Sequence, residues 1–290
     1  MYEKFILASD LSPATLEIIK CVGILKTVGM KEVIIFHALG IKYLDTMQYD
    51  LMRYAEPALL EEKQALEKLS YSVKIAVCKN GTAWELNKVF EKEKAVLVII
   101  GSHGAGMSFD SPIGGTAEKI LHDSNVPLLI IRLQKLEGEA LPRCKADCLN
   151  FSKKILYVTD FSDTSHRAFT HLENIVEAGA HRIALLHVQD KTKIEKHLLT
   201  RLEEFNRMDM SRLEMLKKAL ISKGAREVEI LLKYGVPVAE ILKTSMEDDY
   251  TLIVMGSQGR GYIKEIFLGS VSDNVVRRAT IPVLLIPAFR

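Results

Sequence analysis

The sequence has few cysteines and almost no excess of basic over acidic residues. Four cysteines occur in 290 residues, and lysine plus arginine exceed aspartate plus glutamate by 39 to 37. So few cysteines suit a reducing compartment and exclude a disulfide-rich scaffold. A net charge of +2 is too small to predict binding to nucleic acid or to an anionic membrane.

Long apolar runs are absent as well. None is long enough to cross a bilayer, and residues 1–4 lead directly into an expected strand, so we predict neither a membrane span nor a signal peptide. With 48% hydrophobic and 26% charged residues, the composition is that of a globular protein. We expect a cytoplasmic protein whose length suits two domains of roughly 130 to 150 residues.

The cysteines divide into two pairs. Cys21 and Cys78 lie in apolar patterns and are predicted to be small core residues. Cys144 and Cys148 lie four positions apart in an expected linker. We interpret them as free thiols, since a metal site needs further ligands and no neighbouring residue supports a redox pair, but their role stays open.

An internal repeat of about 150 residues runs through the chain. Its matched landmarks are Asp10 and Asp160, His37 and His187, Gly101 and Gly256, and Pro127 and Pro282. The offset is 150 for the first two pairs and 155 for the last two. A repeat of this length indicates a duplicated domain rather than a solenoid unit. We expect domains over 1–133 and 151–290, joined by a linker over 134–150.

Apolar runs and amphipathic patterns alternate in each half, which predicts alternating strands and helices. Strands are expected over 4–9, 31–38, 72–78, 95–100, 126–132, 154–159, 182–188, 227–232, 251–255 and 283–286. Helices are expected over 13–28, 43–69, 82–94, 116–124, 163–178, 191–223, 237–247 and 271–278, with Pro57 bending or interrupting the second. The fold class is therefore α/β, with two tandem doubly wound parallel sheets covered by helices on both faces.

A glycine loop follows the fourth strand of each half. Two residues separate Gly256 from Gly259, nine separate Gly259 from Gly269, and a helix follows. Glycine allows backbone N–H groups to approach an anion, and a helix N-terminus adds unpaired donors. The first half repeats the spacing at Gly101, Gly104 and Gly114. Because ligands of such sheets bind where the strand order reverses, the aspartate after each first strand should meet this loop, as a nucleotide site requires.

These motifs resemble the universal stress protein domain of the ATP-binding type. The resemblance rests on Asp160, on His187-Val188, on Gly235-Val236-Pro237 and on the glycine loop, and it covers both halves outside the linker. It implies a five-stranded parallel sheet of order 3-2-1-4-5 in each domain. It also implies pairing of the two domains through their last strands as an internal pseudo-dimer. Whether two chains pair further stays open.

The resemblance also implies which residues contact an adenine nucleotide. In the second half Asp160 would take ribose or adenine, the Val188 backbone the adenine edge, and the glycine loop the phosphates. The candidates there are Thr159, Asp160, Val188, Met255, Gly256, Ser257, Gly259, Arg260, Gly269, Ser270 and Val271. Those of the first half are Ser9, Asp10, Ala38, Gly101, Gly104, Gly114, Gly115 and Thr116.

The two sites are predicted to be unequal. Gly115 replaces the serine of the motif in the first half, with Thr116 one position late. Between Gly104 and Gly114 the first loop has one acid and no base, whereas between Gly259 and Gly269 the second has Arg260, Lys264 and one acid. A triphosphate should prefer the second loop by roughly 1–2 kcal/mol if one base reaches it.

Other conspicuous residues are given structural interpretations. His37 and His187 should be packed, hydrogen-bonded histidines, and Trp84 a helix-core residue. His103 either touches a phosphate or is exposed. The charged helix 191–223 should present a solvated or partner-facing surface, with Met208, Met210 and Met215 filling the core or an interface.

We predict a non-enzymatic, adenine-nucleotide-binding stress or regulatory protein that holds ATP, ADP or AMP, with Mg2+ accompanying ATP left open. Its protein partners are unknown. The Gly-Lys-Ser ending of a P-loop is absent, so fast phosphoryl transfer is not expected. One alternative is a slow ATP hydrolase in which Asp160 or His103 positions a water or metal. Another is an interaction module with a vestigial N-terminal site.

Overall fold

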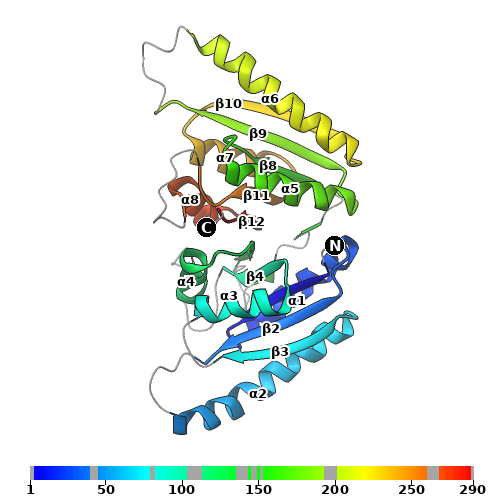
Figure 1. The fold of residues 1–290 in the computed structure, drawn as a ribbon, viewed down its shortest axis with the longest axis vertical. Coiled ribbons are helices and arrows are strands. Elements are labelled where there is room, and N and C mark those ends of the chain that lie inside the picture. The colour runs from blue at the N-terminus through cyan, green and yellow to red at the C-terminus, as the bar shows by residue number, and fades with distance from the viewer. Residues whose placement is uncertain are drawn as a thin grey trace. The chain divides into compact units, whose positions relative to one another are not determined.

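The chain divides into two compact units, Met1–Leu149 and Asn150–Arg290, called the first and second unit below. The computed structural model describes residues 3–39, 45–78, 82–102, 113–134, 143–144, 149–150, 153–192, 201–259 and 268–288. Each unit contains one five-stranded parallel sheet with helices (Figure 1).

The sheet of the first unit has the order β3-β2-β1-β4-β5, with every neighbouring pair parallel. Its strands are β1 (Lys4–Ser9), β2 (Glu32–Ala38), β3 (Ser72–Cys78), β4 (Leu97–Gly101) and β5 (Leu128–Ile131). Its helices are α1 (Pro13–Val22), α2 (Asp45–Lys68), α3 (Thr82–Glu93) and α4 (Gly115–Asp123). The helices α1 and α2 contact each other on one face of the sheet, and α3 and α4 contact each other on the other face. Because both faces are covered, the central strands are apolar throughout.

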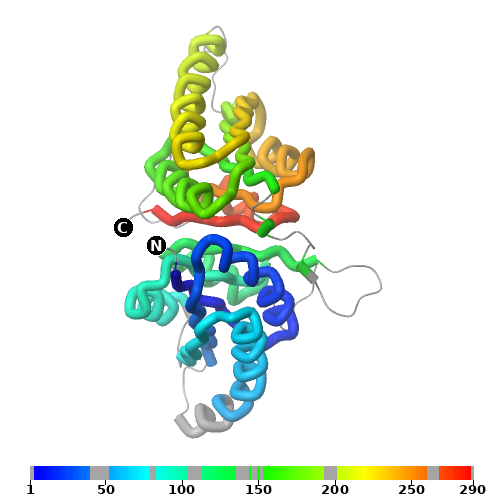
Figure 2. Tube along the Cα trace, turned by 90° about the vertical axis from the view of Figure 1, so that its right-hand side faces the viewer, coloured from blue at the N-terminus to red at the C-terminus, as the bar shows by residue number. Residues whose placement is uncertain are grey.

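The second unit, which is coloured from green to red in Figure 2, repeats this architecture in the order β10-β9-β8-β11-β12. Its strands are β8 (Lys154–Val158), β9 (Arg182–Asp190), β10 (Glu227–Gly235), β11 (Tyr250–Gly256) and β12 (Val283–Ile286). Its helices are α5 (Asp163–Glu177), α6 (Leu202–Ser222), α7 (Pro237–Glu247) and α8 (Ser270–Arg278). The predicted fold class and the strand order 3-2-1-4-5 are confirmed in both units.

Several element boundaries differ from the sequence prediction. The α2 helix continues through Pro57 without interruption. The first predicted helix ends earlier as an α-helix, since it passes into a 3-10 helix, η1 (Gly23–Val28), which Gly29 closes at φ 87°. The predicted helix start at Lys191 is wrong, because β9 extends to Asp190 and a turn follows it. Pairing along the whole of β10 explains this longer strand.

The predicted linker contains regular structure. Within it β6 (Leu133–Gln134) pairs antiparallel with β7 (Arg143–Cys144). Leu149, at the end of the same segment, is fully buried. Cys144 Sγ lies 3.5 Å from the carbonyl oxygen of Glu17 on α1, so this end of the segment packs on the first unit. Cys148 lies outside the described residues.

Two core predictions are wrong, and for three methionines one of two alternatives is excluded. Trp84 is 62% exposed because its neighbours Ala83 and Leu86 occupy the buried face of α3, and the Nζ of Lys88 lies 3.2 Å from its ring centroid. The methionines of α6 are exposed because its buried stripe consists of other residues, so they do not fill the core and an interface stays the open alternative; they are Met208, Met210 and Met215. Cys21 and Cys78 are only half-buried.

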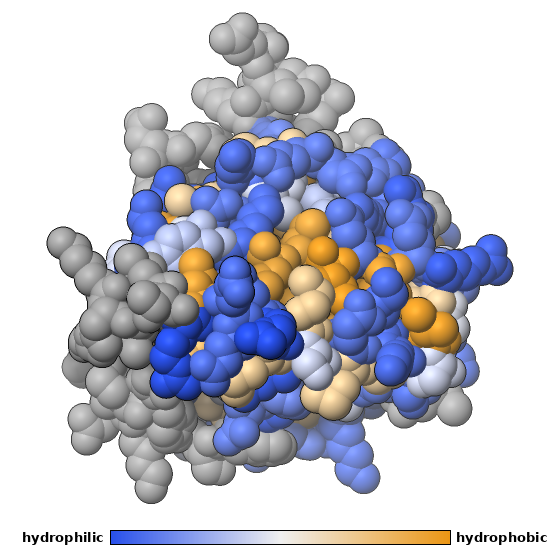
Figure 3. Space-filling model, turned by 90° about the horizontal axis from the view of Figure 1, so that it is seen from above, coloured by the Kyte–Doolittle hydropathy of each residue, from blue (hydrophilic) through white to orange (hydrophobic). Residues whose placement is uncertain are grey.

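Exposed apolar side chains such as these interrupt an otherwise hydrophilic surface, and Figure 3 shows one face where the two kinds adjoin. In the described ranges, no helix combines the length and apolar character needed to cross a bilayer.

Candidate functional site

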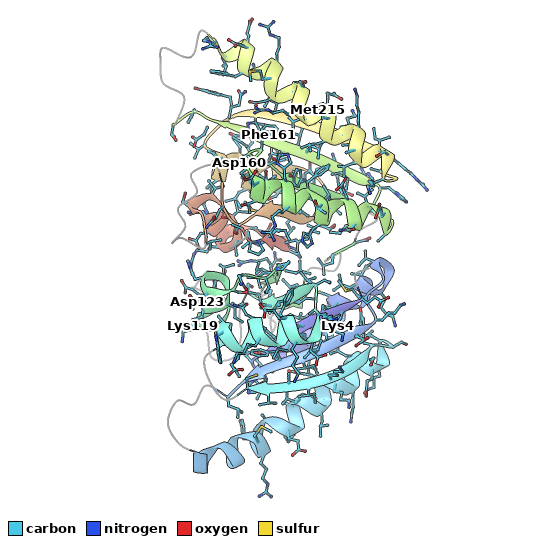
Figure 4. All side chains as sticks on the ribbon, viewed as in Figure 1. Lys4, Lys119, Asp123, Asp160, Phe161 and Met215 are labelled. Atoms are coloured by element: carbon cyan, nitrogen blue, oxygen red, sulfur yellow. The ribbon has the colours of Figure 1, made fainter. Side chains whose placement is uncertain are left out.

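The carboxylate turn of the second unit follows β8 directly. Phe161 N–H donates to Thr159 Oγ1 at 3.0 Å, and Ser162 N–H donates to Asp160 Oδ1 at 3.1 Å. Phe161 has φ 60°, an uncommon conformation for a bulky residue. The Ser162 hydroxyl then caps α5 by accepting from Ser165 N–H. These bonds hold Asp160 at the carboxyl edge of the sheet, where it lies beside Phe161 (Figure 4).

The glycine loop reaches this turn. A Cβ placed on Gly259 would lie 2.6 Å from Asp160 Oδ2, far inside van der Waals contact. The Ser162 hydroxyl also donates to the carbonyl oxygen of Gln258 at 3.4 Å. Gly256 approaches α5 as closely, since its Cβ would lie 2.8 Å from Thr164 Cγ2 and 3.0 Å from a backbone carbon. The aspartate turn and the loop therefore meet at one edge, where a Cβ at Gly259 would displace the Asp160 carboxylate and a Cβ at Gly256 would press on Thr164.

The α8 helix begins where the loop returns. Gly269 is its N-cap, and the Gly269 N–H donates to the carbonyl oxygen of Ser257 at 2.7 Å. The Ser272 hydroxyl donates to the carbonyl oxygens of Ser257 and Gly269, which fixes the first turn against the strand end. No described side chain caps this helix, and uncapped N–H groups at the first turn of a helix are the kind of donors that bind anions.

The end of β9 completes this edge. His187 Nδ1 lies 2.7 Å from the Thr159 carbonyl oxygen, and because a carbonyl only accepts, the ring donates this bond. His37 makes the same contact with Ser9 at 2.9 Å. Both histidines are buried, so their interpretation as packed, hydrogen-bonded residues is confirmed. Val188 follows, half-buried and in register with Lys233 of β10.

The remaining candidates of the second unit are placed as follows. Met255 is buried in β11, and Ser257 is 3% exposed with an Oγ that has no hydrogen-bond partner among the described residues. Ser270 and Val271 are the first two residues of α8. Arg260 lies outside the described residues, as does Lys264.

The first unit repeats the carboxylate turn. Leu11 N–H donates to Ser9 Oγ at 3.0 Å, Ser12 N–H donates to Asp10 Oδ1 at 3.1 Å, and Leu11 has φ 64°. Gly114 N–H donates to the Ser102 carbonyl oxygen at 2.8 Å, matching Gly269 and Ser257.

The other first-unit candidates lie at the same edge where they are described. Gly101 ends β4, Ala38 ends β2, and Gly115 and Thr116 open α4. Gly104 and His103 lie outside the described residues. Ala117 occupies the position of Ser272, so the hydroxyl that ties the first turn of α8 to the strand end has no counterpart at this position of α4.

A buried carboxylate in the first unit was missed by the sequence analysis. Glu62 on α2 is 2% exposed and accepts a 2.7 Å hydrogen bond from the Ser9 hydroxyl. The pKa of Glu62 is raised to about 7, mainly by burial; the Ser9 hydrogen bond lowers it, and the negative charges of Asp10 and Glu61 add to the rise. The signal was present, because Glu62 falls on the helical stripe that contains Leu59 and Leu66.

The second unit has a different buried carboxylate, also missed. Asp209 on α6 is 9% exposed and shares a helical stripe with Leu213 and Leu220. It accepts from Gln189 Nε2 at 2.9 Å, and His187 Nε2 lies 3.5 Å from the same oxygen. In the ranges that the structure covers, no group of three or more His, Cys, Asp or Glu is arranged to hold a metal ion.

Comparison with known proteins shows to which family the chain belongs. The model of the universal stress protein family matches residues 1–132 and 152–287. A universal stress protein of Methanocaldococcus jannaschii, MJ0577, is 35% identical over 153 residues, which cover 46% of this chain and 94% of that protein. Another, Rv2319c of Mycobacterium tuberculosis, is 26% identical over 203 residues, 69% of this chain and 66% of its own length.

The fold is also found among solved structures. A universal stress protein from Archaeoglobus fulgidus aligns over 99% of this chain and 96% of its own, with a TM-score of 0.75 and 22% identity. Since the family model covers both units, the chain belongs to the universal stress protein family and contains two such domains in tandem.

Proposed function

We propose that the second unit binds an adenine nucleotide, ATP, ADP or AMP, at the edge where Asp160 meets the glycine loop. Asp160 takes the ribose hydroxyls or adenine, and the Val188 backbone takes the adenine edge. The loop backbone and the first turn of α8 take the phosphates. The observation that carries this is the contact of Gly259 with Asp160, which joins a carboxylate and a phosphate-binding backbone in one site.

Three further features support the proposal. The first turn of α8 presents N–H donors without a side-chain cap in the described residues, as a bound phosphate requires. Ser257 has a buried hydroxyl without a partner among those residues, which a ligand would satisfy. Adenine-nucleotide binding is typical of the family.

The first unit is proposed to bind nucleotide more weakly. It keeps the aspartate turn and the glycine cap of α4 but lacks the hydroxyl of Ser272. Glu62 adds a second acid close to Asp10, which disfavours an anionic ligand. The first loop also has no basic residue between Gly104 and Gly114.

Nucleotide occupancy would then stabilise one state of the chain that a protein partner recognises, which makes the protein a regulatory nucleotide binder rather than an enzyme. Pairing of the two domains through their last strands, and of two chains, stays a prediction.

Small molecules released from the freshly purified, denatured protein test this function by mass spectrometry. We expect an adenine nucleotide at a ratio near one per chain. Protein that releases no nucleotide, and whose melting temperature does not rise on adding ATP, ADP or AMP, would contradict the proposal.

A further inference from the structure

The turn that presents Asp160 is held on both sides by residues connected to α6. Asp160 lies between Thr159 and Phe161 in the chain. The Thr159 carbonyl oxygen accepts from His187 Nδ1 at 2.7 Å, and the Nε2 of the same ring lies 3.5 Å from Asp209 Oδ2. Because Nδ1 donates to Thr159, Nε2 carries a hydrogen toward Asp209 only in the imidazolium form of His187, and it is in this form that the ring connects one side of the turn to α6.

The other side is connected through an aromatic ring. The ring of Phe161 lies 4.5 Å from that of His187, centroid to centroid. The guanidinium of Arg212 lies 5.2 Å from the Phe161 ring, within cation–π range, and its Nη1 lies 3.5 Å from Asp209 Oδ1. One carboxylate oxygen of Asp209 therefore lies near His187 and the other near Arg212, and both of these residues contact Phe161. We call this ring of contacts the α6 bracket; its members are Asp209, His187, Phe161 and Arg212.

The first unit lacks this bracket. Leu66 and Leu220 accept matching backbone bonds at the ends of α2 and α6, from Tyr71 and Ala225. This pairs positions of α2 and α6 at an offset of 154, so Ala55 matches Asp209 and Ala58 matches Arg212. At the offset of 150, Leu11 matches Phe161 and Leu39 matches Gln189. The first unit keeps only the histidine, and its strand-end hydroxyl, Ser9, donates to Glu62 instead.

We propose that Asp209 is a positioning residue for nucleotide binding in the second unit, because its bracket fixes the turn that aims Asp160 at the ligand. This inference rests on the proposed function. Asp209 does not touch the ligand; it acts through His187 and Arg212 on the two chain neighbours of Asp160. A carboxylate that must be held within a fraction of an ångström needs such buried, hydrogen-bonded support.

The first test needs no ligand. Hydrogen–deuterium exchange of the full chain is compared for Asp209→Asn and for Glu214→Gln, which removes one charge from an exposed position of the same helix. We expect Asp209→Asn to speed exchange in residues 159–162 on the order of tenfold, because the Phe161 N–H bond to Thr159 loosens, and Glu214→Gln to leave it unchanged. Arg212→Gln, at a half-exposed position, removes the other contact of Asp209 with the turn and should speed the same exchange.

The second test measures coupling by calorimetric titration with ATP, in chains that also contain Asp10→Ala so that the second unit is observed. Asp209→Asn should weaken binding on the order of tenfold. In a chain that contains Asp160→Ala, Asp209→Asn should cause no further loss of ATP affinity. In a chain that contains Gly269→Ala, it should still weaken ATP binding by the same factor as in the parent chain. A general loss of stability would instead weaken binding by the same factor in both backgrounds.

The outcomes separate the two proposals. Unchanged exchange at 159–162, or losses that add with those of Asp160→Ala, would overturn the role of Asp209 while leaving nucleotide binding intact. A parent chain that binds no ATP would overturn the proposed function and the ligand role with it, whereas the exchange result would still decide whether Asp209 holds the turn.

Discussion

Gly259 lies so close to Asp160 that a single methyl group on its Cα would come within 2.6 Å of the Asp160 carboxylate. The residue that ends the described part of the loop therefore lies against a residue of the turn after β8, although about a hundred positions separate them. This contact brings the proposed ribose and phosphate subsites together.

Gly259→Ala should weaken adenine-nucleotide binding by the second unit about tenfold or more, equivalent to about 1.4 kcal/mol. The added methyl must displace the Asp160 carboxylate, while no backbone strain arises because the φ of Gly259 lies outside the left-handed range. Calorimetric titration with ATP measures the loss. Gly23→Ala is the matched control, since its new methyl would make only ordinary 3.6 Å contacts with Leu69. Equal affinities for the two variants would show that Gly259 is not part of the site.

Gly269→Ala and Gly114→Ala should have unequal effects. Both glycines cap the helix that follows the loop, but only the second unit has the Ser272 hydroxyl and the basic loop residues. A Cβ on Gly269 would lie 3.3 Å from the Ser257 carbonyl oxygen. We expect Gly269→Ala to remove most of the rise in melting temperature that ATP produces, and Gly114→Ala to remove little. Equal losses in the thermal-shift titration would contradict the asymmetry of the two sites.

Gly256→Ala should destabilise the second unit by about 1–3 kcal/mol through overpacking. Its methyl would press on Thr164 Cγ2 and on the backbone of the first turn of α5. Urea unfolding followed by circular dichroism should show the loss, and Thr164→Ser should restore part of it by removing the opposing methyl. The fluorescence of Trp84, the single tryptophan, reports the first unit and should keep its midpoint. An unchanged dichroism transition would refute the close packing.

The first unit should lose stability as pH rises through 7. The pKa of Glu62 is about 7 in the folded chain against 4.5 for an ordinary glutamate, so the folded state binds the proton more tightly than the unfolded state. Proton binding by Glu62 contributes its full share to the free energy of unfolding below pH 4.5. This share, about 3 kcal/mol at most, is lost as pH rises through 7. Trp84 fluorescence during urea unfolding at pH 5 and pH 8 measures the difference.

Glu62→Gln should remove this slope and raise the stability of the first unit at pH 8, since an uncharged amide still accepts from the Ser9 hydroxyl. Glu61→Gln changes the exposed neighbour and should leave most of the slope in place. If the stability of the first unit still falls with pH in Glu62→Gln, the pH dependence comes from another group.

The sequence alone determined the architecture. The 150-residue repeat and the alternation of apolar strands with amphipathic helices require two parallel sheets, because β-α-β crossovers are right-handed and place helices on both faces. The glycine spacing and the matched aspartates likewise located both candidate sites, since strand ends in such a sheet share one edge. The repeat, the hydrophobic alternation and the glycine spacing are regular patterns along the chain, so they can be recognised from the sequence without coordinates.

Only the tertiary structure decided which polar residues support each turn. Glu62 and Asp209 lie far in sequence from Ser9 and His187, so only the packing of α2 and α6 on their sheets brings them together. It also placed Trp84 outside the core, although its helix is amphipathic, because the rotation of α3 on the sheet buries Ala83 and Leu86 instead. Periodicity defines the apolar face of a helix, whereas the contacts between that face and the sheet decide which single polar side chains are buried and what they hold.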